Sequence, residues 1–111
     1  MIIWHNPRCS KSRQTLALLQ DHGHQPSVRL YLQDAPSAAE IITTRNALGV
    51  TADQMIRRGE KLYKELGLAT ATEDQLIEAM AAHPILIERP VLIMGDRAAI
   101  GRPPEAVLGI L

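Results

Sequence analysis

The chain has 111 residues, with 12 basic and 12 acidic side chains and a formal charge of zero. This length predicts one domain with its own core, and the balanced charge gives no support to nucleic-acid binding or to a polybasic membrane anchor. No apolar run approaches the ~20 residues that span a bilayer. One cysteine cannot form a disulfide within the chain, and no targeting segment is recognisable, so we expect a cytoplasmic protein.

The four histidines do not suggest a metal site. His5, His22, His24 and His83 are scattered, and neither they nor the cysteine have the spacing of zinc ligands. We therefore expect no metal and no tightly bound cofactor.

The first third of the chain predicts a βαβ unit. Residues 2–5 are nearly all apolar, which is typical of a central strand. A helix is expected from Ser10 to His22, with Gly23 as its stop signal, followed by a second strand over residues 28–32. This order implies parallel strands joined by a right-handed crossover.

The middle of the chain is expected to be helical throughout. A Ser or Thr followed three positions later by Glu or Gln opens the first and the last of these helices, in the spacing of a capping box, and glycines end the first three. The four predicted helices are Ser37–Leu48, Thr51–Arg58, Lys61–Leu66 and Thr72–Ala82.

The last third predicts an extended segment over residues 83–90, a hairpin of residues 91–94 and 98–100, and a final helix from Pro103. The complete order favours an α/β (α+β sandwich) protein with a thioredoxin-like fold. It would form a single domain over residues 1–111 with a helical insertion at about 37–82, between the second and third strands. That fold carries a proline before its third strand, held cis and facing the active cysteine, and Pro90 stands in that place.

Cys9 lies where the first strand hands over to the first helix. The first backbone N–H groups of a helix lack internal partners and carry the positive end of its dipole, which stabilises a thiolate. Arg8, Lys11 and Arg13 add positive charge, and His5 would add more if it were protonated. A lone cysteine can instead be a buried, inert hydrophobe, but these basic flanks favour a reactive thiol.

The segment around this cysteine, residues 5–13, resembles the H-N-P-x-C-x-x-S-R active-site segment of glutaredoxin-linked arsenate reductases. The likeness covers almost the whole chain and is strongest where two separate motifs agree in order. Its other parts are Leu30–Leu32, Arg57, Tyr63, Leu66–Leu68, His83–Pro90 and Gly101–Glu105.

The resemblance implies an arsenate reductase whose cysteine thiolate forms an adduct with arsenate, with glutathione as co-substrate and glutaredoxin as the partner that takes up the mixed disulfide. The residues that match the catalytic set are Cys9, Arg57, Arg89 and Arg102. Arginines suit this chemistry because each presents a fixed fork of donors to an oxyanion and stays charged. Without the resemblance, Arg57 would be an ordinary solvated residue on a short helix.

Three neighbours of the cysteine are expected to support it. His5 lies close enough in sequence to approach the thiol, or it is only a polar strand end. The hydroxyl of Ser12 faces either the thiolate or backbone N–H groups, and Arg13 either contributes to the positive field or forms a surface pair.

Two other functions remain open from the sequence. The protein could be a glutathione-linked thiol oxidoreductase with another substrate, since a single cysteine must take its second thiol from outside. It also resembles Spx-like regulators, which bind RNA polymerase, but these usually carry a C-x-x-C switch, and here Ser12 replaces the second cysteine.

Overall fold

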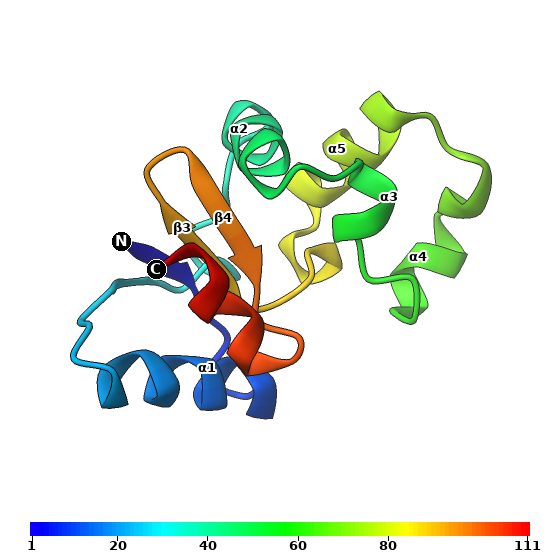
Figure 1. Ribbon diagram of the computed structural model, residues 1–111. Coiled ribbons are helices and arrows are strands. Elements are labelled where there is room, and N and C mark those ends of the chain that lie inside the picture. The colour runs from blue at the N-terminus through cyan, green and yellow to red at the C-terminus, as the bar shows by residue number, and fades with distance from the viewer. The chain divides into compact units, whose positions relative to one another are not determined.

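The computed structural model describes residues 1–111, and the chain divides into two units (Figure 1). The first unit comprises Met1–Asp34 and Arg89–Leu111, and the second is the continuous segment Ala35–Glu88. None of the helices combines the length and the apolar character that crossing a bilayer requires.

The first unit is built on a four-stranded sheet in the order β2-β1-β3-β4. β1 is parallel to β2 and antiparallel to β3, and β3 is antiparallel to β4. The predicted βαβ unit and the predicted hairpin are thereby confirmed. The strands are β1 (Ile2–Trp4), β2 (Ser27–Arg29), β3 (Val91–Met94) and β4 (Arg97–Ile100), and the helices of this unit are α1 (Ser10–Asp21) and the 3₁₀ helix η3 (Pro104–Ile110).

The core of this unit lies between the sheet and its two helices. Ile3 of β1 and Leu92 of β3 are register partners, and they pack with Leu19 of α1 and Val107 of η3 in one fully buried cluster. Figure 1 shows α1 and the red C-terminal helix beside each other. This packing fixes the start of α1, where Cys9 lies, against the strand ends.

Gly101 allows a close approach in this unit. Its N–H donates to the Pro90 carbonyl at 2.9 Å, and a Cβ at this position would clash with the Thr15 side chain and lie 2.8 Å from Pro90 Cγ. We expect Gly101→Ala to lower the free energy of unfolding by about 1–3 kcal/mol through overpacking. Urea unfolding measures this, with Gly109→Ala as the matched control because a Cβ there meets open space. Equal stabilities of the two variants would contradict the clash.

The second unit is helical, as predicted. The capping boxes at Ser37 and Thr72 are both formed, and Gly49 ends the first helix in the left-handed conformation at φ 69°. The elements are α2 (Ala38–Leu48), α3 (Ala52–Met55), α4 (Lys61–Glu65), η1 (Leu68–Thr70), α5 (Glu73–Ala82) and η2 (Pro84–Leu86).

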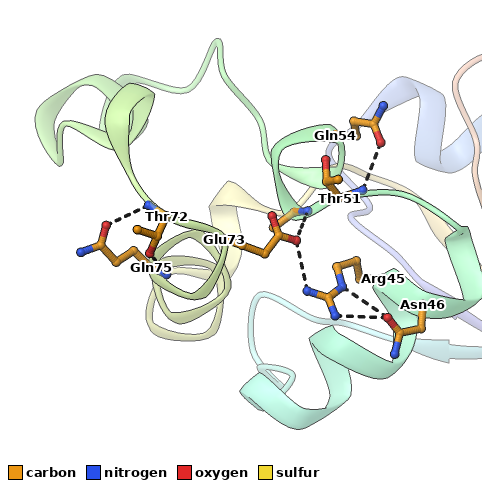
Figure 2. Close-up of polar contacts among 8 residues, drawn as sticks. Arg45, Asn46, Thr51, Gln54, Thr72, Glu73 and Gln75 are labelled. Carbon is orange, nitrogen blue, oxygen red and sulfur yellow. Dashed lines mark hydrogen bonds and ion pairs between the residues drawn. The ribbon is translucent and has the colours of Figure 1, made fainter.

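One carboxylate joins three of these helices (Figure 2). Glu73, at the start of α5, accepts the backbone N–H of Ala52 at 2.7 Å and forms a 3.1 Å ion pair with Arg45 of α2. Glu73 is therefore shared by α2, α3 and α5 and ties the helical unit together at one point.

Several predicted boundaries are wrong. The helix expected over 51–58 ends at Met55, because Ile56 forms an antiparallel bridge with Ile87 and the Glu88 N–H donates to the Met55 carbonyl at 2.8 Å. Arg57 consequently lies outside any helix.

Three other predicted elements differ in type or length. The segment 83–90 is not extended throughout, since it contains the 3₁₀ turn η2. The final helix is 3₁₀ rather than α, and β2 ends at Arg29 because the chain turns at once, with the N–H of Asp34 donating to the Leu30 carbonyl at 2.8 Å.

Candidate active site

Cys9 is the N-cap residue of α1 and its side chain is 8% exposed. A tight turn places it there: the Cys9 N–H donates to the Asn6 carbonyl at 3.0 Å, and the Arg8 N–H donates to Asn6 Oδ1 at 3.0 Å. The first turn of α1 holds no acidic residue. The positive end of the helix dipole is therefore unopposed at the sulfur.

The pKa of the Cys9 thiol is lowered from its ordinary value. Burial, the largest single influence, raises this pKa. It is outweighed by hydrogen bonds from the backbone N–H groups of Ser12 and Lys11, together with the positive charges of Arg89 and Arg102. The backbone and the two guanidinium groups thus act together to favour the thiolate.

The two arginines from the C-terminal part of the chain form a linked pair beside the sulfur. Arg102 Nη2 lies 3.6 Å from Cys9 Sγ, and Arg102 Nε donates to the Arg89 carbonyl at 2.8 Å. The Arg89–Pro90 peptide is cis, as the fold predicted, and the Arg102–Pro103 peptide, for which no cis bond was expected, is cis as well. Residues distant in sequence are thus brought to one sulfur.

His5 and Ser12 bond to each other. His5 Nδ1 and Ser12 Oγ lie 2.6 Å apart, and Ser12 Oγ accepts the Asn6 N–H at 3.0 Å. Burial, followed by the charge of Arg13, lowers the pKa of His5, so the imidazole is mostly neutral near pH 7 and does not add the positive charge considered from the sequence. Ser12 reaches the sulfur through its backbone N–H, and its hydroxyl serves the turn.

Arg13 also braces this turn. Its Nη1 donates to the Pro7 carbonyl at 2.8 Å, and its backbone N–H donates to the Cys9 carbonyl at 3.0 Å. The charge of Arg13 remains near His5 rather than in a surface ion pair.

Arg57 belongs to the second unit. Its N–H donates to the Leu86 carbonyl at 2.7 Å, while its guanidinium donates to the Ile85 carbonyl at 3.2 Å and pairs with Glu60 at 3.2 Å. Of the four predicted catalytic residues, the first unit therefore brings three together, and Arg57 is held by neighbours in the helical unit.

The cluster of Cys9, Arg89 and Arg102 combines a nucleophile with donors for an anion. Arg102 is exposed as a whole residue, so an oxyanion can approach its guanidinium from solvent and meet the sulfur beside it. No group of three or more His, Cys, Asp or Glu side chains is arranged to hold a metal ion. The arrangement suits nucleophilic attack by sulfur on an oxyanion.

Comparison with known proteins agrees with this site. The sequence profile of the ArsC family matches residues 4–110. This chain belongs to the ArsC family. It is 49% identical to the arsenate reductase of Haemophilus influenzae, covering 100% of this chain and 98% of that protein. It is also 48% identical to the uncharacterized protein YfgD of Escherichia coli, covering 98% and 94%.

The solved structures confirm the thioredoxin-like ArsC fold. The arsenate reductase from Vibrio cholerae superposes with a TM-score of 0.96 at 49% identity, covering 99% of this chain and 96% of that one. The family that the cysteine motif resembles is therefore the family to which the chain belongs.

Sequence reasoning missed two residues that shape the site of this ArsC protein. Asn6 orders the cysteine turn through its carbonyl, its N–H and its side chain. The Asn-Pro pair signalled a turn but not these bonds. Glu60 binds Arg57, and its only signal in the sequence is its i+3 spacing from that arginine.

The depressed pKa of Cys9 predicts an effect of pH on both reactivity and stability. We expect alkylation by iodoacetamide to titrate below the ~8.5 of a free thiol, since the folded state favours the thiolate. Because the folded pKa is the lower one, this group stabilises the fold fully above the unfolded pKa, and the stabilisation is lost as pH falls through the folded pKa. Denaturant unfolding of wild type and Cys9→Ala, measured against pH, checks this. A pH-independent difference between the two would contradict it.

Proposed function

We propose that this protein reduces arsenate to arsenite, with the Cys9 thiolate as nucleophile, glutathione as co-substrate and glutaredoxin as the regenerating partner. The observation that carries the proposal is the contact of Arg102 Nη2 with Cys9 Sγ at 3.6 Å, at a thiol whose pKa is lowered. The names of relatives nearly half identical to the chain support arsenate as the substrate.

The first step forms a sulfur–arsenic bond. The Cys9 thiolate attacks arsenic, and a protonated arsenate oxygen leaves as water, which gives a thiol–arsenate adduct. Thiolate and arsenate are both anions, so their approach is opposed unless fixed cations lie nearby. Arg102 and Arg89 supply such positive charge at the sulfur.

The second step carries out the reduction. A glutathione thiolate attacks the sulfur of Cys9, the sulfur–arsenic bond breaks, and its electron pair remains on arsenic, which leaves as arsenite. Cys9 is then joined to glutathione as a mixed disulfide. Glutaredoxin removes the glutathione by thiol–disulfide exchange and restores the thiol.

An external thiol is required because Cys9 is the only cysteine of the chain and is free. A pocket of about 340 Å³ adjoins the cysteine turn, with both polar and apolar walls, as a peptide thiol requires. Its walls are His5, Asn6, Pro7, Arg8, Leu30, Leu32 and Gln33. We propose that the reaction runs in the cytoplasm, where glutathione is kept reduced.

Arg57 completes the proposed catalytic set. Its role rests on its match to the family motif, since its position within the helical unit does not by itself indicate catalysis. We propose that it binds an arsenate oxygen with the donors of its guanidinium, as Arg89 and Arg102 do.

The proposal is tested by following NADPH oxidation in the presence of glutathione, glutathione reductase and glutaredoxin while arsenate is varied. We expect saturable dependence on arsenate, loss of the signal without glutaredoxin, and no turnover with phosphate, which has the same shape but is not reduced by thiols. No dependence on arsenate would overturn the function. Turnover of a glutathione mixed disulfide alone would favour a glutathione-linked oxidoreductase with another substrate.

A further inference from the structure

Glu60 is placed to control Arg57. Both side chains are only about one-fifth exposed, and Glu60 Oε2 lies 3.2 Å from Arg57 Nη1. The same Nη1 donates to the Ile85 carbonyl at 3.2 Å. The two hydrogens of Nη1 are therefore directed to two acceptors within the helical unit.

The rest of the arginine is fixed as well. The backbone N–H of Arg57 donates to the Leu86 carbonyl at 2.7 Å, and its carbonyl accepts the Glu60 N–H at 3.2 Å. Ile56, next in the chain, is bridged to Ile87. With both backbone and Nη1 held, the guanidinium plane has one preferred orientation.

This orientation leaves one edge of the guanidinium available. Nε–H and one N–H of Nη2 point the same way and form the edge that receives two oxygens of a tetrahedral oxyanion. The printed contacts of the Arg57 guanidinium all use Nη1, so this edge is not used within the protein.

We infer that Glu60 is a positioning residue that anchors Arg57 through Nη1 and presents its Nε–Nη2 edge to the oxyanion substrate. The inference rests on the proposed function, in which Arg57 binds arsenate. Glu60 itself does not touch the substrate. Its side chain does not cap α4, although Glu60 is the N-cap residue of that helix, so its role is separable from helix formation.

Glu60→Ala tests the inference. Because Arg57 would lose its anchor and bind substrate in fewer of its conformations, we expect KM for arsenate to rise by about three- to tenfold with kcat changed less than about twofold. Glu60→Gln keeps a side-chain acceptor at the same reach and is expected to restore KM to within about twofold of wild type. Glu65→Ala is the matched control, since Glu65 pairs with Lys61 on the exposed face of the same helix at 3.7 Å, and should leave KM unchanged.

Arsenate binding is measured independently of turnover, as protection of Cys9 from iodoacetamide. Glu60→Ala is expected to raise the protecting concentration of arsenate in step with KM, and to have no further effect in an Arg57→Ala background. A normal KM in Glu60→Ala, or a Glu60→Gln variant as impaired as Glu60→Ala, would overturn the inference. If Arg57→Ala itself changed neither protection nor KM, the error would lie in the proposed role of Arg57, and circular dichroism separates all these outcomes from misfolding.

Discussion

Cys9→Ser is expected to reduce arsenate turnover to the rate measured without the protein. Serine keeps the size of the side chain and can accept the same N–H groups of Lys11 and Ser12, but a hydroxyl remains protonated at a pH at which the Cys9 thiol ionises. It also cannot exchange with glutathione, since a disulfide needs two sulfur atoms. The loss should therefore appear in kcat, with little change in stability at pH values below the folded pKa of the thiol.

The coupled NADPH assay measures this loss, and Ser10→Ala is the matched control. Ser10 is the next residue, exposed at the first position of α1, and its replacement should leave activity near that of wild type. Arsenate-dependent turnover by Cys9→Ser above a few per cent of wild type would show that the sulfur is not the nucleophile.

Arg102→Ala is expected to lower kcat/KM by at least tenfold, toward the ~10²–10³-fold that loss of one preorganised donor typically costs. Arg102 loses two functions in this variant: its positive charge 3.6 Å from Cys9 Sγ and its hydrogen bond to the Arg89 carbonyl. The pKa of Cys9 should rise, so the pH–rate profile should move to higher pH. Arg97→Ala, which removes an exposed arginine of β4, is the control for charge alone.

Two further variants separate the roles of the pair. Arg102→Lys retains a positive charge but not the fork that joins sulfur and carbonyl, so it should shift the pKa less than Arg102→Ala while kcat/KM stays low. Arg89→Ala should raise the pKa of Cys9 more than Arg102→Ala, because the charge of Arg89 has the larger influence on it. An unchanged pH profile in Arg89→Ala and Arg102→Ala would contradict the charge effect.

Local signals in the sequence predicted much of the fold. The capping boxes at Ser37 and Thr72 fixed two helix starts correctly, because a capping box involves only residues four positions apart. The strand pairings followed from connection rules, and the turn at Gly95 joins the predicted hairpin.

The errors arise where contacts distant in sequence override local preference. Nothing in residues 52–58 indicates that Ile56 pairs with Ile87, yet this bridge ends the helix and sets the backbone of Arg57. In the same way, the hydrogen bond of His5 to Ser12 and its burial decide its protonation, which neither residue alone reveals.

The candidate site was predictable in composition but not in geometry. The motif placed Cys9 at a helix start and matched Arg89 and Arg102, but the 3.6 Å contact of Arg102 with the sulfur depends on the folded path of the C-terminal segment. Asn6 and Glu60 were missed because their partners are found only in the folded chain.

The N–H groups of Lys11 and Ser12 that favour the Cys9 thiolate belong to the main chain. Every amino acid except proline supplies such a group, so drift in the identity of these two residues leaves this share of the acidity intact. The sharpest sequence constraint there is negative: proline at position 11 or 12 deletes a donor, whereas most other replacements change only the surrounding surface.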